Sequence, residues 1–380
     1  MKKTFRTDYI YLVAISLALM LWGCSSAETK AQQALKKLNV PEGFSIEVYA
    51  DDVPNARQMA FGGKGTLYVG SRQAGKIYAV IDRNGDFKAD TVYTVAEDLR
   101  LPSGVAFKDG ALYVGAVSRI LRYDNINDQI EDPPEPVVVT DAYPTDGHHG
   151  WKFIAFGPDG KLYVPVGAPC NTCEPDKDIY ATITRINEDG SNREIIARGV
   201  RNSVGFAWHP ETGHLWFTDN GRDWLGDNRP PDELNKLTEK GQHFGYPYRH
   251  GSDIWDPELG DKGQSKDQAF QPPARELDPH VAALGMIFYT GSMFPPSYKN
   301  SILIAEHGSW NRSEKIGYRI TKVSLKNGQA GTYQPFVDGW LQPNESVWGR
   351  PADLLQLPDG SVLIADDHKG IIYRVTYNPN

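Results

Sequence analysis

Two adjacent histidines are the residues of this chain best placed to do chemistry. His148 and His149 precede an apolar run, which a Gly-Pro-Asp-Gly turn joins to a second apolar run. Asp-Gly between two short β-rich runs is a strong hairpin signal, so we expect the pair in a loop at the entrance of a strand. An imidazole there can act as a general base near neutral pH. For a single histidine, a hydrogen bond to the loop backbone would be the more ordinary role.

Four other stretches carry side chains that suit an anion or a cation. Arg201 and Asn202 offer a planar guanidinium beside an amide, which suits carboxylate or quinone oxygens. Acidic residues at 219–223 and 232–235 lie among loop carbonyls, a donor set that suits Ca²⁺; the same residues could serve only as turn and cap residues. Basic and aromatic residues gather in two further stretches, 306–312 and 348–353. Together these loops predict a site for a planar anion beside a cation.

A hairpin pattern that recurs along the chain predicts the fold. In each copy a turn precedes an apolar triplet, and the triplets begin at Leu67, Leu112, Leu162, Leu215, Leu303 and Leu363. Six copies at blade-like intervals are typical of a β-propeller, whose blades close into a ring to bury their faces. We therefore predict an all-β fold, a six-bladed β-propeller in which loops from distant parts of the sequence meet at one rim.

One interval between two repeats is much longer than the others. Residues 218–285 are rich in Asp, Pro, Gly and aromatic residues, and we predict a long loop insertion on the functional face of the propeller. Its tryptophans and tyrosines argue against a disordered excursion. The net charge of −8 over 380 residues, with both signs mixed throughout, lacks the basic stripe that nucleic-acid binding requires.

The N-terminus is typical of a targeting segment. Basic residues precede an apolar run that ends at Cys24, and the run is short for a membrane span but suits a secretory signal. The sequence around Cys24 resembles a bacterial lipobox, which implies lipidation of that thiol and an anchor facing the periplasm, at the outer membrane. We expect a signal peptide over 1–23, a polar tether over 24–37 and the propeller over 38–380. An ordinary signal peptide with an incidental cysteine is the alternative.

The two remaining cysteines form a Cys-x-x-Cys pair, Cys170 and Cys173. In an oxidising periplasm such a pair is expected to form a local disulfide that stiffens a loop. A redox-active pair would be expected in a thioredoxin-like βαβ context, which the flanking sequence lacks. Glu174 follows the second cysteine where haem attachment needs a histidine.

Taken together, these motifs resemble the soluble pyrroloquinoline quinone (PQQ)-dependent sugar dehydrogenase family, the sorbosone, aldose and glucose dehydrogenase-like group. The resemblance covers nearly all of the mature chain. The motifs that carry it are His149 before its hairpin, Arg201-Asn202, Asp232-Glu233-Leu234-Asn235, His243-Phe244-Gly245-Tyr246-Pro247, Glu306-His307-Gly308-Ser309-Trp310-Asn311 and Gly349-Arg350-Pro351.

The resemblance implies that PQQ lies over the centre of the ring. His149 would take the hydroxyl proton of the sugar while hydride passes to the quinone carbon. The implied cofactor contacts are Arg201, Asn202 and Arg350, with Arg57, His307 and Arg312 as further candidates and Gln58 as a weaker one. One Ca²⁺, which polarises the quinone, would bind the carbonyls of Gly221 and Arg222, and a second, structural Ca²⁺ would bind Glu233 and the carbonyl of Phe244.

Three positions depart from the family pattern. Trp151 and Lys152 stand where a Gly-Arg pair often follows the histidine, so Lys152 is the candidate to replace that arginine. Arg222 stands where the calcium loop usually has proline. His307 or Arg312 occupies the region where many members place a lysine over PQQ.

These expectations define a PQQ- and Ca²⁺-dependent oxidoreductase of an aldose or sugar aldehyde, with a periplasmic electron acceptor, no nucleic-acid partner and membrane attachment by a lipid anchor only. One alternative is a Ca²⁺-dependent lactonase-type hydrolase, in which the metal and His149 activate water. Another is a non-catalytic propeller that binds a glycan or a protein partner. The arginines near His149 favour the oxidoreductase, since a hydrolase of a neutral sugar needs fewer cations.

Overall fold

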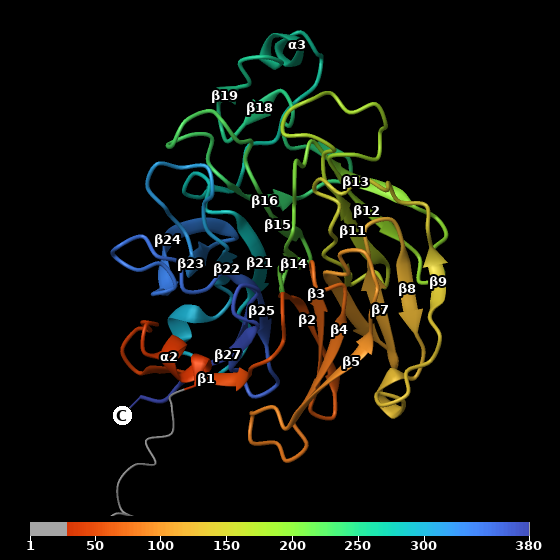
Figure 1. Cartoon of the computed structure of the whole chain (residues 1–380). Helices are drawn as coiled ribbons and strands as arrows, with labels where there is room; N and C mark the ends of the chain where they lie inside the picture. The colour runs from red at the N-terminus through yellow and green to blue at the C-terminus, as the bar shows by residue number, and fades with distance from the viewer. Residues whose placement is uncertain (1–28, 380) are drawn as a thin grey trace, which may run out of the picture.

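The computed structural model describes residues 29–379, and their strands form a six-bladed β-propeller (Figure 1). First strands of neighbouring blades contact one another, so these strands lie nearest the centre of the ring. The first blade contains β2 (Ala56–Gly63), β3 (Thr66–Ser71), β4 (Ile77–Ile81) and β5 (Thr91–Ala96). The second contains β6 (Gly104–Lys108), β7 (Ala111–Gly115), β8 (Ile120–Tyr123) and β9 (Val137–Thr140). The third contains β10 (Ala155–Phe156), β11 (Leu162–Val166), β12 (Thr182–Ile186) and β13 (Glu194–Arg198).

The sixth blade closes the ring with strands from both ends of the chain. The fourth blade contains β14 (Phe206–Trp208), β15 (Leu215–Asp219), β16 (Glu233–Leu237) and β20 (Arg275–Glu276). The fifth contains β21 (Ala283–Phe288), β22 (Ile302–Glu306), β23 (Arg319–Lys326) and β24 (Gln329–Val337). The sixth contains β25 (Pro351–Gln356), β26 (Val362–Asp366), β27 (Ile371–Tyr377) and, on its outer edge, β1 (Phe44–Ala50). The antiparallel pairing of β1 with β27 joins the two ends of the described chain.

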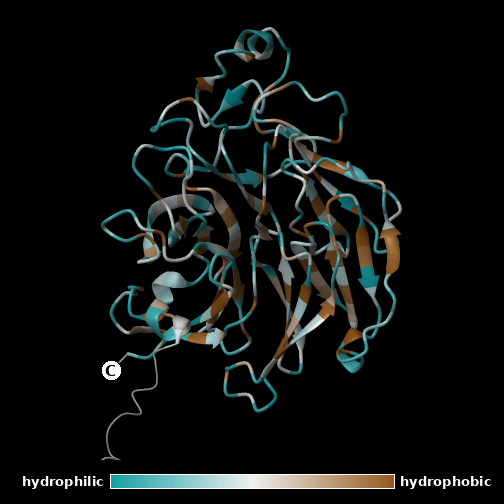
Figure 2. Ribbon diagram, in the orientation of Figure 1, coloured by the Kyte–Doolittle hydropathy of each residue, from teal (hydrophilic) through white to brown (hydrophobic). Residues whose placement is uncertain are grey.

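The recurring apolar triplets are the second strands of the blades, and alternation explains why all three residues are buried. Successive side chains of a strand point to opposite faces. In the first blade, Leu67 and Val69 pack toward the sixth blade, whereas Tyr68 packs toward the second. Six hydrophobic clusters of this kind each lie between two neighbouring blades. Apolar residues accordingly concentrate in the strands, and the connecting loops are mostly hydrophilic (Figure 2).

The N-terminal part of the described chain packs on the propeller. Helix α2 (Lys30–Leu35) begins with a capping box at Thr29, and it buries Ala31 and Ala34 against the fifth and sixth blades. The tether expected over 24–37 therefore ends earlier than predicted, because these small apolar residues fix the helix to the core. The signal peptide over 1–23 and Cys24 lie outside the described residues. No helix within residues 29–379 has the length and apolar character needed to cross a membrane.

The long interval 218–285 is only partly an insertion. Strands β16 and β20 belong to it and complete the fourth blade, and β21 begins the fifth. Between them, β17 (Gln242–His243) adds a parallel strand beside β13. The rest carries the hairpin of β18 (Arg249–His250) and β19 (Ile254–Trp255) and the short helix α3 (Gly260–Gln264), which project from the ring (Figure 1). The 3₁₀ turn η2 (Ile126–Asp128) lies in the loop between β8 and β9, and η3 (Pro296–Tyr298) lies in the loop between β21 and β22.

Candidate functional site

The candidate residues reach one rim because the first two strands of each blade are antiparallel. Pro351, which begins β25, pairs with Asp366 at the end of β26, and Ala283 pairs with Glu306 in the same way in the fifth blade. Loops that enter first strands and loops that leave second strands therefore share an end of the ring. We call the end that carries His149 the histidine rim.

Residues from opposite blades meet at this rim. Arg72, which directly follows β3, lies close enough to His149 for its charge to lower the pKa of that imidazole. Burial, then Arg57 and Arg350, lower the pKa of Arg72. His149 from the third blade and Arg350 from the sixth thus share a neighbour from the first blade. This is the convergence that the expected site requires.

His149 is held as a neutral imidazole. Its Nδ1 lies 2.9 Å from the carbonyl oxygen of Ala168, and because a carbonyl only accepts, Nδ1 carries the proton and donates. Burial, followed by the charges of Arg201 and His148, lowers the pKa of His149 well below its ordinary value. Nε2 is therefore unprotonated at neutral pH and is the nitrogen that can accept a proton. A Cβ at Gly167 would lie 2.5 Å from the Cβ of His149, so this approach requires glycine.

Arg201 and Asn202 are fixed by the last residue of β15. The carboxylate of Asp219 accepts the backbone N–H of Arg201 at 2.8 Å and that of Asn202 at 2.6 Å. Burial, then the nearby Glu233, raises the pKa of Asp219 well above its ordinary value, and the two N–H donors oppose this effect. The Arg201 guanidinium donates to the carbonyl of Asn220 at 3.2 Å. The strand end thereby positions both residues for a ligand.

The sixth blade repeats this arrangement. Asp366, the last residue of β26, accepts the backbone N–H of Arg350 at 2.9 Å, as Asp219 does for Arg201. Next to it, Asp367 accepts Nη1 of Arg57 at 2.8 Å and pairs with Nε2 of His307 at 2.8 Å. Burial lowers the pKa of His307 to about 4 although Asp367 opposes this. Two predicted cofactor contacts, Arg57 and His307, are thus engaged by one carboxylate.

Two arginines of the histidine rim lack a carboxylate partner in the described chain. Among residues 29–379, Arg72 and Arg350 form no ion pair with a carboxylate: Arg350 donates to the carbonyls of His307 at 3.1 Å and Gly308 at 2.8 Å. The guanidinium of Arg72 stacks on Trp151, 4.2 Å from the ring centre. Nε of Arg72 and Nε1 of Trp151 are buried without a hydrogen-bond partner. Buried unpaired donors on cationic and aromatic groups suit an anionic, planar ligand.

The predicted calcium positions depend on backbone oxygens. No cluster of three or more His, Cys, Asp or Glu side chains suited to a metal occurs in the described chain. Gly221 is held through its N–H by Asp232 at 2.8 Å, and the Arg222 side chain pairs with Asp256 at 2.5 Å. These contacts use the N–H of Gly221 and the side chain of Arg222, and they do not involve the carbonyl of either residue.

The predicted second cation position contains one unpaired acceptor. The buried carboxylate of Glu233 accepts Nδ2 of Asn235 at 2.9 Å and the N–H of Gly251 at 2.7 Å. Oδ1 of Asn235 is buried and unpaired. Burial raises the pKa of Glu233 to about 7. The carboxylate oxygens of Glu233 and Oδ1 of Asn235 are ligands that fit a cation. Phe244, the other predicted ligand, is buried, and its N–H donates to the carbonyl of Arg198 at 2.8 Å.

Three candidates have other roles in the structure. Arg312 donates to the carbonyls of Asp227 and Glu314, so it joins two rim loops and does not share partners with the other arginines. Lys152 is 2% exposed and burial lowers its pKa to about 7; its Nζ lies over the Tyr143 ring, 5.8 Å from the centre. It therefore does not stand in for the family's arginine beside His149. Gln58 bridges the inner strands through Val105 and Ile154.

Sequence reasoning missed three residues of the rim. Arg72, Asp366 and Asp367 all directly follow or end the second strand of a blade. Each lies within three residues of the end of a recognised triplet, and the equivalent positions at the ends of β15 and β22 are among the predicted stretches. Comparing the same position in every repeat would have found them.

Cys170 and Cys173 form a disulfide. The hydroxyl of Tyr246, from the insertion, accepts the backbone N–H of Cys173 at 3.2 Å and contacts Sγ of Cys170 at 3.3 Å. The predicted disulfide is therefore present, and Tyr246 connects its loop to the insertion.

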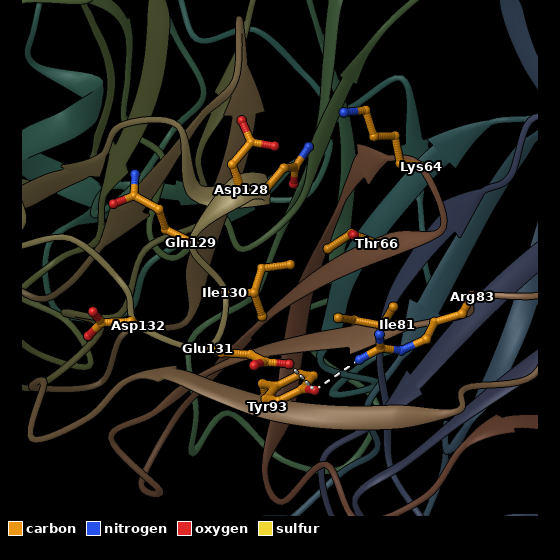
Figure 3. A pocket seen from close by; sticks show the side chains of 11 residues that line it. Lys64, Thr66, Ile81, Arg83, Tyr93, Asp128, Gln129, Ile130, Glu131 and Asp132 are labelled. Carbon is orange, nitrogen blue, oxygen red and sulfur yellow. Dashed lines mark hydrogen bonds between the residues drawn. The ribbon is translucent and has the colours of Figure 1, made fainter.

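A separate hollow of about 630 Å³ opens at the other end of the ring. It lies between the first two blades and includes Lys64 of the β2–β3 turn, at the opposite end of β2 from Arg57. Figure 3 shows Tyr93 in this hollow, donating to Glu131 at 2.8 Å and accepting from Arg83 at 2.9 Å. The Tyr93 hydroxyl thereby links Arg83 to Glu131, and the hollow lies at the end of the ring away from His149.

The strands define a six-bladed β-propeller, and loops of several blades bring arginines together at one end of the ring. The chain belongs to the family described as "Domain of unknown function (DUF7133)", whose model matches residues 30–379. It is 35% identical over 390 residues to an "Uncharacterized protein" of Borreliella burgdorferi, with 99% of each chain covered.

Solved structures share the fold at low sequence identity. A Trichoderma reesei structure titled as "Carbohydrate-Active Enzymes Family AA12" has a TM-score of 0.75 at 20% identity and covers 90% of this chain and 98% of its own. The holo form of the "Pyranose Dehydrogenase PQQ domain" from Coprinopsis cinerea has a TM-score of 0.72 at 17% identity, covering 89% and 97%. At these identities the likeness establishes the propeller fold.

Proposed function

We propose that this protein is an oxidoreductase that oxidises an aldose or a sugar aldehyde with PQQ and Ca²⁺ at the histidine rim. The observation that carries the proposal is the neutral His149 imidazole near Arg72, which in turn lies near Arg350. Neither of these two guanidinium groups forms an ion pair with a carboxylate of the described chain. A base next to surplus positive charge suits proton removal from a neutral substrate beside a bound anion. The titles of the structures with the same fold, which name carbohydrate-active and PQQ proteins, support the same assignment.

Each residue of the rim has a role in this proposal. Arg350 and Arg72 bind carboxylates of the anionic cofactor, and Arg201 with Asn202 binds its polar edge. Nε2 of His149 takes the proton from the sugar hydroxyl, and the Ala168 carbonyl keeps the ring in the tautomer that can do so. PQQ, when bound, supplies the acceptor for the electron pair that leaves the sugar carbon.

Ca²⁺ would be held by backbone oxygens beside the same site. The carbonyls of Gly221 and Arg222 would bind the ion that withdraws charge from the cofactor. Glu233, together with the carbonyl of Phe244 and the unpaired Oδ1 of Asn235, would hold a structural ion.

Two exposed tryptophans beside the rim support a carbohydrate substrate. Trp224 is 67% exposed and Trp310 is 64% exposed, and their rings meet edge to face with centroids 5.2 Å apart. Indole faces can cover the apolar C–H face of a sugar ring while its hydroxyls stay solvated. Ser313 and Arg312 both bond to Asp227, which fastens the two loops that carry these rings.

The electron acceptor and cellular location complete the proposal. We propose a periplasmic acceptor and attachment of the protein to the outer membrane through a lipid on Cys24. Radiolabelled palmitate should enter the wild-type protein in cells and not a Cys24→Ser variant. Labelling of both proteins alike would contradict the anchor.

Reconstitution tests the activity. Purified apoprotein is mixed with PQQ and Ca²⁺, and reduction of a redox dye is followed with a panel of aldoses. Dye reduction that needs PQQ, Ca²⁺ and a sugar together is the expected result. No dye reduction with any sugar would contradict the proposal, and lactone hydrolysis without PQQ would assign the hydrolase instead.

A pair of arginine variants tests the location of the site. Arg350→Gln should weaken PQQ binding by about 10–100-fold, since it removes a charge-assisted contact. Arg122→Gln is the matched control, because Arg122 pairs with Asp124 on the second blade, away from the rim. Equal affinity of both variants for PQQ would place the cofactor elsewhere.

A further inference from the structure

The Cys170–Cys173 disulfide encloses a residue that makes four hydrogen bonds to the rim. The carbonyl of Asn171 accepts Nε of Arg201 at 3.0 Å, and its Oδ1 accepts Nη2 of Arg201 at 2.8 Å. The same Oδ1 accepts the backbone N–H of Asp223 at 2.8 Å, and Nδ2 donates to the carbonyl of Asp223 at 3.2 Å. Every hydrogen-bonding group of this side chain is therefore used.

Asn171 joins two loops that come from different strands. Arg201 lies in the loop that enters β14, and Asp223 lies in the loop that leaves β15, next to Gly221 and Arg222. Nη2 of Arg201 is also 3.3 Å from a carboxylate oxygen of Asp223. Asn171, Arg201 and Asp223 therefore each contact the other two. These contacts together restrict the orientation of the Arg201 guanidinium.

The disulfide restrains the backbone that carries Asn171. A bridge across three residues of separation removes most of the conformations of the short loop between the cysteines. Tyr246 adds a hydrogen bond from the N–H of Cys173 to its buried hydroxyl. Without the disulfide, the loop that carries Asn171 would lose conformational entropy each time Asn171 binds Arg201, and this loss would weaken the contact.

We propose that Asn171 is a positioning residue, and that the Cys170–Cys173 disulfide holds it so that Arg201 and the Gly221–Asp223 loop face the same ligand. Asn171 needs no contact with substrate or cofactor for this role. The proposal rests on the proposed function only where it equates that ligand with PQQ and Ca²⁺. The contacts themselves can be tested in the apoprotein.

Amide hydrogen exchange tests the positioning without any ligand. In Asn171→Ala the amide of Asp223 loses its acceptor, so its exchange should accelerate by about tenfold or more. The amide of Gly221, held by Asp232, is an internal reference that should not change. Thr172→Val is the matched control, because the Thr172 hydroxyl is buried without a partner in the same loop. Unchanged exchange at Asp223, or equal acceleration in Thr172→Val, would overturn the role of Asn171.

The role of the bridge is tested by the Cys170→Ser, Cys173→Ser double variant. Exchange at Asp223 should accelerate while the circular dichroism spectrum and cooperative unfolding stay those of a folded propeller. If this variant protects Asp223 as well as the wild type does, the disulfide does not hold Asn171, and that part of the proposal is wrong.

Cofactor binding separates this inference from the proposed function. Asn171→Ala and the double serine variant should each weaken PQQ binding by about 10–100-fold, the usual effect of removing a residue that orients a ligand contact. If the wild type binds no PQQ, the proposed function fails while the exchange results still decide the positioning role. If exchange accelerates but PQQ affinity is unchanged, Arg201 is positioned for some other ligand and the link to PQQ is wrong.

Discussion

One hydrogen bond, from Nδ1 of His149 to the carbonyl of Ala168, gives the two ring nitrogens different roles. Nδ1 donates to Ala168, so Nε2 is left as the acceptor, and burial, followed by the surrounding positive charge, keeps it unprotonated. The same charge makes it a weaker base than a solvent-exposed histidine. A bound anion at Arg72 and Arg350 would offset that charge and strengthen the base, so ligand binding and base strength are coupled.

Replacement of His149 tests its role as the base. His149→Ala should lower turnover by about 10²–10⁴-fold, the range typical of general-base removal, while PQQ binding persists, because the arginines remain. Dye reduction gives turnover, and the absorbance of bound PQQ gives binding. His148→Ala is the control, since His148 is exposed. Retained turnover in His149→Ala with loss in His148→Ala would move the base to His148.

The acid side of the pH–rate profile should report the lowered pKa of His149. The base works only when Nε2 is unprotonated, and burial, Arg201 and His148 lower the pKa of the ring. Activity should therefore persist as pH falls through 6.5, the ordinary pKa of histidine, and be lost only at lower pH. The measurement is kcat/KM for the sugar between about pH 4 and 8. A midpoint at or above the ordinary histidine value would contradict the assignment.

Asp353 on β25 should make the protein less stable as pH rises. Its Oδ2 accepts the N–H of Met59 at 2.8 Å, Oδ1 is unpaired, and burial raises its pKa to about 7. Since the folded pKa exceeds the unfolded value of about 4, this group's contribution to stability is present below about pH 4 and is lost as pH rises through about 7. Relative to wild type, Asp353→Asn should gain about 2–4 kcal/mol of unfolding free energy between about pH 4 and 8. Denaturant unfolding at both pH values measures the change, and an equal difference at both would contradict it.

At the scale of elements, the last residue of a second strand orients the loop before the first strand. Asp219 and Asp366 do this in the fourth and sixth blades with the same backbone contacts. Glu306 occupies the same position in the fifth blade but pairs with Arg319 instead. The same position of the repeat therefore orients a rim loop in two blades and forms an ion pair in another.

Asp366→Ala should separate orientation from stability. Oδ1 of Asp366 accepts the N–H groups of Arg350, His368 and Lys369, so the variant should lose about 2–4 kcal/mol of unfolding free energy and bind PQQ about 10–100-fold more weakly. Asp359→Ala is the control. It removes contacts to Ser361 and Arg374 at the other end of the same blade and should lower the melting temperature without changing PQQ affinity. Equal PQQ affinity in the two variants would contradict the proposed role of Asp366.

The strands could be predicted from the sequence, but most contacts between side chains on different strands and loops could not. The triplets that begin at Leu67 and Leu363 predict second strands because alternation buries every residue in them. The hairpin turn that follows the apolar run after His149 likewise places this histidine at a strand entrance. Pairings such as Asp367 with Arg57, or Asn171 with Arg201, join residues that are far apart in the sequence, and no local pattern records them. The contact of Arg312 with Asp227 could not be predicted for the same reason, since Asp227 lies on another loop.

At the scale of the whole molecule, stability depends on the sixth blade. β27 pairs with β26 on one side and with β1 on the other. Its residues Ile371, Ile372, Tyr373 and Val375 are all buried. Since each blade is packed only against its two neighbours, opening one blade exposes the faces of the adjacent pair.

Ending the chain after Gly370 should abolish cooperative folding. The truncation removes β27 and leaves β1 and β26 with unpaired edges, a loss larger than the total stability of about 5–15 kcal/mol expected for such a domain. Calorimetry should show no sharp transition and limited proteolysis should degrade the chain. Ending the chain after Asn378 is the control and should leave both measurements unchanged. A cooperative transition in the shorter chain would show that five blades suffice.

The pairing of β1 with β27 also sets an order of events during synthesis. The ribosome releases β1 among the first strands of the domain, but its only sheet partner is the last strand to be made. A nascent chain therefore carries an exposed apolar edge through almost the whole of translation, which is the state most prone to aggregation. We therefore expect correct folding during synthesis to depend on how well that edge is shielded until β27 has been made and can pair with it.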